Sequence, residues 1–196
     1  MTSQVEPTRD TAWELLCEFT QSESLRKHAL TVEGVMRYFA RRAGQDDEPW
    51  GIAGMLHDYD YEQYPTAEEH GRRGAEVMRE RGWPEVLARA VESHNPATGV
   101  TRDSAMERTL YAVDELAGFI TAVALVRPSK SIHDVKVKSV RKKMKDKAFA
   151  RAVNRDDIVN GADELGVELN EHIGEVIAAM QEIAAEIGLE GERAGG

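Results

Sequence analysis

The chain has 196 residues, of which 41% are hydrophobic and 31% charged, and its formal net charge is −10. That balance is ordinary for a globular domain, and the length suffices to bury a core without disulfides. Cys17 is the one cysteine, so an intrachain disulfide is excluded, which fits a reducing compartment. The bulk acidity argues against general nucleic-acid binding.

No segment of the sequence is typical of export or of membrane insertion. Residues 1–10 are polar and lack the apolar core of a secretory signal. The longest apolar stretch, residues 116–126, is too short to span a bilayer and is interrupted by Gly118 and Thr121. We therefore expect a soluble, cytoplasmic protein without a membrane partner.

Apolar residues recur at helical spacing along most of the chain and no alternating β-branched run stands out, so the sequence predicts an all-α protein. Capping residues, glycines and prolines indicate where helices begin and end. In chain order, helices are expected over residues 8–20, 22–43, 49–58, 67–81, 84–94, 102–126, after 132, 155–165 and 170–187. We expect three parts: a helical core (1–126), a C-terminal helical extension packed on it (127–190) and a flexible tail (191–196).

Histidines and carboxylates on apolar helical faces are the candidate functional residues. Asp58 and Asp114 fall inside apolar stretches, where a carboxylate without a partner is costly. Four of the six histidines lie upstream of Asp114: His28, His57, His70 and His94. Each residue alone has a more ordinary interpretation as a core or surface residue. Together, imidazoles and carboxylates are ligands that suit Mn, Fe, Ni, Co or Zn.

The order of these residues resembles the HD-domain superfamily of metal-dependent phosphohydrolases, with its HDIG-like members. The local sequence supports this in four segments: LRKHALTVEGVMRYFA, WGIAGMLHDYDYEQYP, EEHGRRGAEVMRERGWPEVLARAVESHNP and RTLYAVDELAGF. The resemblance covers roughly residues 20–126. It implies an all-α HD-domain helical bundle, here followed by the C-terminal extension.

The resemblance also implies a ligand set. Four residues match the ligands of a primary metal: His28, His57, Asp58 and Asp114. His70 and His94 match two further histidines of the two-metal branch, in which Asp58 would bridge two divalent ions. The alternative is a single ion, with His70 and His94 in contact with the substrate. Carboxylates that orient the histidines are also expected, and sequence proximity suggests Glu33, Glu68, Glu69 and Glu92 as candidates.

The sequence departs from its relatives at two places. Many relatives read Ile-Gly-Lys after the His-Asp pair, whereas Tyr59, Asp60 and Tyr61 stand here, so an anion must be held by other cations. The His-His-Glu and Gly-Tyr-Pro features of cyclic-di-GMP phosphodiesterases are absent, and the chain has ESHNPATG instead. That specific activity is therefore not expected.

The function that the resemblance implies is hydrolysis of a small phosphorylated substrate, with nucleotides among the candidates, by metal-activated water, as a phosphomonoesterase or phosphodiesterase. His57 and Asp58 would be at the centre of catalysis. Two alternatives share the ligand set: a mixed-valence di-iron oxygenase and a non-catalytic metal- or nucleotide-binding sensor. The complete ligand set argues against the sensor.

One basic segment stands out from the acidic chain. Residues 127–147 hold nine Lys or Arg and two Asp, a local charge of +7. We expect a phosphate clamp beside the metal, formed by Arg127, Lys130, Lys138 and Arg141. The alternative is a solvated basic helix or a patch for an acidic partner. His133 and His172 are expected not to be ligands, and the apolar face of the last helix is expected to be core or a homodimer contact.

Overall fold

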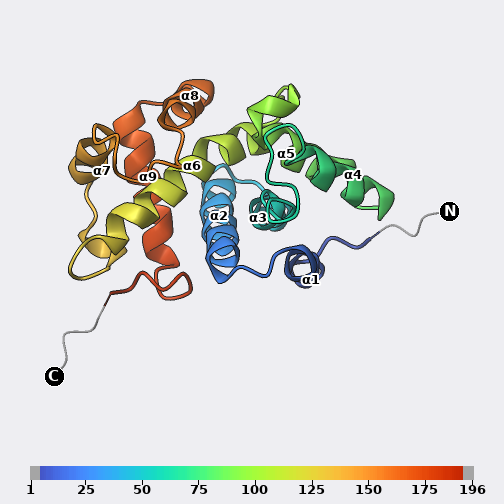
Figure 1. Ribbon diagram of the computed structural model, residues 1–196, viewed down its shortest axis with the longest axis horizontal. Coiled ribbons are helices and arrows are strands. Elements are labelled where there is room, and N and C mark those ends of the chain that lie inside the picture. The colour runs from blue at the N-terminus through green and yellow to red at the C-terminus, as the bar shows by residue number, and fades with distance from the viewer. Residues whose placement is uncertain (1–4, 192–196) are drawn as a thin grey trace. The chain divides into compact units, whose positions relative to one another are not determined.

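The computed structural model describes residues 5–191 (Figure 1), and within that range the regular structure is entirely helical, which confirms the predicted all-α fold. The predicted tail lies outside the described residues except for Gly191. The α-helices are α1 (Arg9–Phe19), α2 (Glu23–Arg42), α3 (Asp47–Leu56), α4 (Arg72–Glu80), α5 (Glu85–His94), α6 (Ala105–Leu125), α7 (Val137–Met144), α8 (Arg155–Leu165) and α9 (Leu169–Glu182). Two short 3-10 helices, η1 (Pro96–Thr98) and η2 (Ile132–Asp134), lie in the connections.

The described residues form two compact units. The first ends at Tyr111 and the second begins at Ala112, so that the division falls inside α6. The predicted boundary after residue 126 stays a prediction. In the part of the chain that the structure describes, no helix combines the length and the apolar character needed to cross a bilayer.

The first unit is organised around the packing of α2 against α3, with α1 and α5 also against α3 (Figure 1). Ser22 caps α2 by accepting a hydrogen bond from the Leu25 N–H. Val32, Val35 and Met36 of α2 are fully buried, and each such side chain contributes about 1.5–3 kcal/mol. Gly54 permits the close approach of the two helices, since a Cβ there would lie 2.8 Å from the Val32 carbonyl oxygen.

The third helix begins at Asp47, before the predicted start at Pro49. Asp46 is its N-cap and accepts a hydrogen bond from the Glu48 N–H at 3.1 Å. Pro49 therefore occupies the third position of the first turn, where a backbone N–H has no partner within the helix and its loss costs little. The helix ends at Leu56, so that His57 and Asp58 follow it directly.

The helix predicted over residues 67–81 was wrong in its first turn, because α4 begins only at Arg72. Gly71 has a φ of +77°, a conformation that a helix cannot contain. The Asp60 carboxylate accepts hydrogen bonds from the backbone N–H groups of Gly71 and Gly74, at 2.9 and 2.8 Å. A distant side chain thus caps α4, and His70 lies in the turn before the helix rather than inside it.

The second unit is assembled on α9, against which α7 and α8 pack. The apolar face of α9 is buried through Ile173, Val176 and Met180. Gly161 of α8 meets α6 closely, since a Cβ there would lie 2.6 Å from the Ala112 Cα. His172 of α9 is buried and donates from Nε2 to the Ala112 carbonyl at 2.9 Å, so it has a structural partner. Its exclusion from the ligand set stays a prediction.

Candidate metal centre

The His57 ring is fixed by the end of α3. It is fully buried, and its Nδ1 lies 2.7 Å from the Gly54 carbonyl oxygen. A carbonyl can only accept, so Nδ1 carries the proton and Nε2 of the neutral ring presents a lone pair. This arrangement is the usual one for a metal-ligating histidine, whose second nitrogen donates to a fixed acceptor.

His94 and His70 are held in the same way by different acceptors. His94, the last residue of α5, has its Nδ1 2.5 Å from the Val91 carbonyl oxygen. His70 donates from Nδ1 to Asp60 Oδ1 at 2.8 Å. Asn95 secures the turn that holds His70 by donating to the His70 carbonyl at 2.8 Å. Both rings therefore direct Nε2 toward a common point.

Asp58 lies between two groups of imidazoles and presents one carboxylate oxygen to each. Its Oδ2 is 3.4 Å from His57 Nε2 and 3.8 Å from His28 Nε2. Its Oδ1 is 2.9 Å from His70 Nε2 and 3.3 Å from His94 Nε2. Within each group the candidate ligand atoms of these residues all lie within 4.8 Å of one another. One carboxylate is thus shared by two sets of donors.

The spacing of the ring nitrogens fits ligands of a common cation. The Nε2 atoms of His70 and His94 are 3.1 Å apart, and those of His28 and His57 are 3.2 Å apart. Since His70 and His94 both donate from Nδ1, their neutral forms would place two lone pairs face to face, and a proton or a metal ion must relieve that repulsion. Metal–nitrogen bonds of about 2.0–2.1 Å place two ligands of one ion at about this separation.

The pKa values describe the same centre without a metal. Burial alone would raise the pKa of Asp58, but the charge of His57 and hydrogen bonds from His57, His70 and His94 hold it well below its usual range. Burial alone would lower the pKa of His70, but hydrogen bonds to Asp58 and Asp60 outweigh it and raise that pKa to about 9. A proton on His70 therefore takes the place that a cation would fill.

Asp60 is a site residue that sequence reasoning missed. Its carboxylate is fully buried and accepts from the His70 ring and from two backbone N–H groups. Its position two residues after Asp58 was the only signal in the sequence, and it was considered there only as a departure from Ile-Gly-Lys. Of the glutamates suggested for this role, Glu33 pairs with Arg9 and Arg37 instead, and Glu92 pairs with Arg79.

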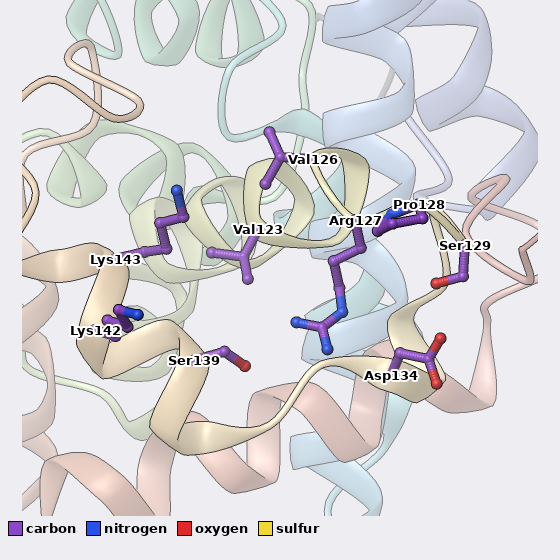
Figure 2. A pocket seen from close by; sticks show the side chains of 9 residues that line it. All are labelled: Val123, Val126, Arg127, Pro128, Ser129, Asp134, Ser139, Lys142 and Lys143. Carbon is purple, nitrogen blue, oxygen red and sulfur yellow. The ribbon is translucent and has the colours of Figure 1, made fainter.

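The remaining predicted site residues lie on the second unit. Asp114 is on α6, and its role as a fourth ligand stays a prediction. Arg127 lines a pocket in which Lys142 and Lys143 are the other cations (Figure 2). Lys130, Lys138 and Arg141 are not among the residues that line that pocket. The phosphate clamp beside the metal also stays a prediction.

Comparison with known proteins agrees with the geometry of the first unit. The family model of the HD domain matches residues 25–118, a range that includes each of the histidines and aspartates considered as ligands. Neither a search of curated proteins nor a search of solved structures found a match to the chain.

Proposed function

Because residues 25–118 belong to the HD-domain family, we propose that this chain is a metal-dependent phosphohydrolase that acts on a small phosphorylated substrate. The observation that supports this most directly is the position of Asp58 between two pairs of imidazoles, with one oxygen near each pair. A carboxylate in that position is suited to bridge two divalent ions. HD domains are generally metal-dependent hydrolases, which favours hydrolysis over the alternatives.

We assign the ligands to two groups. His28, His57 and Asp58 would hold the first ion together with Asp114, which the family match includes. Asp58, His70 and His94 would hold the second. The donors are nitrogen and oxygen, which suits Mn, Fe, Ni, Co or Zn. Bound there, such ions supply Lewis-acid activation of water and of a phosphoryl oxygen.

The protein's own groups prepare the centre for that chemistry. Gly54, Val91 and Asp60 supply the acceptors that fix three imidazoles with Nε2 toward Asp58. Buried rings held by short hydrogen bonds need little reorganisation when a ligand arrives. In the absence of the usual lysine, we propose that Arg127, Lys130, Lys138 and Arg141 hold the anionic substrate.

Metal analysis combined with an activity panel tests this proposal. Purified protein should hold one or two transition-metal ions per chain and should hydrolyse phosphomonoesters or phosphodiesters with Mn, Ni, Co or Fe. His57→Ala and Asp58→Asn should abolish activity and lower metal content. The matched controls are His133→Ala, an exposed histidine, and Asp163→Asn, an exposed aspartate, which should change neither.

Two outcomes would contradict the proposal. Protein that neither contains metal nor takes it up on reconstitution is not a metal-dependent enzyme. Protein whose iron form consumes O₂ and which shows no phosphatase or phosphodiesterase activity is the oxygenase, because the same six nitrogen and oxygen donors serve both chemistries.

A further inference from the structure

The second unit contains a pocket of about 580 Å³ formed by one short stretch of chain, residues 123–143. Val123 lies in the last turn of α6, and Val126 and Arg127 follow directly after that helix ends at Leu125. Ser139, Lys142 and Lys143 lie at spacings of three and four residues on α7, so they share one face of it. The lining is completed by Pro128, Ser129 and Asp134, which connect the two helices.

The pocket places cations beside an apolar wall. Figure 2 shows the guanidinium of Arg127 reaching from the end of α6 into the space bordered by Ser139 of α7 and Asp134 of the η2 turn. Lys142 and Lys143 lie along its α7 side, and Val123, Val126 and Pro128 along its α6 side. A ligand that fits has an anionic group and an apolar part.

The two cations best placed to bind a ligand are not used by the fold. Within residues 5–191, no side-chain hydrogen bond or ion pair engages the guanidinium of Arg127 or the ammonium of Lys142. Lys143 is partly committed, since its ammonium lies 4.5 Å from the centre of the Phe149 ring. An arginine left with all five donors available has the planar fork that matches a phosphate.

In a second basic pocket of the same unit, by contrast, an arginine is already engaged in hydrogen bonds. It measures about 470 Å³ and is lined by Lys147, Arg151 and Arg155 among others. There Arg155 donates to the carbonyl oxygens of Ala150 and Val153 at 3.0 and 2.8 Å, so its guanidinium holds the backbone together. The contrast indicates that the cations of the first pocket are available for a ligand.

We propose that the pocket of residues 123–143 binds a small organic phosphate, with the phosphoryl group on Arg127 and Lys142 and the organic part against Val126 and Pro128. Asp134 disfavours a second anionic group on its side and would accept a hydrogen bond from a hydroxyl or amino group of the ligand. Arg127 is the one cation that this site shares with the proposed substrate clamp, and the site needs none of the metal ligands.

Calorimetric titration of the full chain after removal of metal with a chelator tests the site apart from the metal centre. Phenyl phosphate and inorganic phosphate are the probes. We expect both to bind, phenyl phosphate more tightly, and Arg127→Gln/Lys142→Gln to weaken both by at least about tenfold, the effect of one lost charge-assisted hydrogen bond. Val126→Asn should remove the preference for phenyl phosphate, and as Val126 is 59% exposed the fold should tolerate it.

The control removes the same charge from the same segment outside the pocket. Lys136→Gln/Lys145→Gln alters two exposed lysines and should leave the affinity for both probes within about twofold. Circular dichroism and the melting temperature report whether either double variant is folded.

Three results would overturn the proposal. The first is the absence of binding by either probe to folded, metal-free chain. The second is equal weakening of probe binding by both double variants. That result would show that the probes respond to the overall positive charge of the basic segment and not to this pocket. The third is tight binding of a single-stranded oligonucleotide without binding of phenyl phosphate, which assigns the segment to a polyanion. Metal content and its loss in His57→Ala do not depend on Arg127 or Lys142, so failure of this pocket and failure of the metal centre are distinguishable.

Discussion

His70 Nδ1 lies 2.8 Å from Oδ1 of Asp60, and Oδ2 of the same carboxylate accepts the backbone N–H groups of Gly71 and Gly74. One buried aspartate therefore orients a candidate ligand and begins the helix that follows it. The geometry of the ligands at the His70–His94 side of the centre therefore depends on the same Asp60 carboxylate that determines where α4 begins.

Asp60→Asn should weaken metal binding at the His70–His94 side. The amide keeps the size of the side chain but removes the charge, and its NH₂ group cannot accept from the backbone. Loss of such an orienting carboxylate typically costs about 10–100-fold in metal affinity. Metal titration of the variant should show one tight and one weakened ion. Asp163→Asn, at an exposed aspartate of α8, is the control. Unchanged affinity for both ions in folded Asp60→Asn would contradict the role.

Gly71→Ala should destabilise the protein more than Gly99→Ala. Both glycines have left-handed backbones, with φ of +77° and +73°, so both substitutions cost about 1–2 kcal/mol of conformational energy. Only at Gly71 does the new Cβ meet another group, the Val91 carbonyl oxygen at 3.1 Å, and that oxygen also anchors His94. Denaturant unfolding of the two variants measures the difference. Equal losses would show that the contact with Val91 is relieved without cost.

His172 should make the second unit less stable in acid. Burial lowers its pKa below the ordinary 6.5, although the hydrogen bond to Ala112 opposes this. The unfolded chain then binds the proton more readily, so stability is fully present above about pH 6.5 and falls as the pH drops toward the folded pKa. Replacing His172 with Gln should flatten that part of the profile.

The measurement is the free energy of unfolding between pH 5 and 8, taken as the difference between variant and parent. His133→Gln, at an exposed histidine, accounts for a general effect of losing an imidazole. A variant whose profile matches that of the parent in this range would show that His172 does not titrate differently in the folded state.

Tyr61→Ala should raise KM for an aryl phosphate more than it lowers kcat. Tyr61 is 41% exposed, and its ring meets that of His70 edge-on at 5.1 Å between centroids. It therefore borders the candidate centre from the solvent side. Steady-state kinetics with matched metal content tests this. Tyr38→Ala, at a tyrosine of α2, is the control, and a loss confined to kcat would contradict a role in binding.

The sequence by itself determined those features that depend on residues close together along the chain. The all-α fold, most helix boundaries and the residue types of the candidate centre follow from apolar spacing, caps and the ordered histidines and aspartates, because these signals act over one or two turns of helix. The end of α5 at His94, where the sequence predicts it, is an example of such a local feature.

Tertiary structure decided the features that join residues distant in sequence. The late start of α4 depends on Asp60 reaching Gly71 and Gly74, and the tautomer of His70 depends on that carboxylate as well. Asp58 can present one carboxylate oxygen to each pair of imidazoles only because α2, α3, the turn that contains His70 and α5 lie together. The pocket at Arg127 and Lys142 arises because the chain folds back between α6 and α7. Helical periodicity predicts which residues share a face, but the hydrogen-bond acceptor that each polar group finds is set by packing between helices.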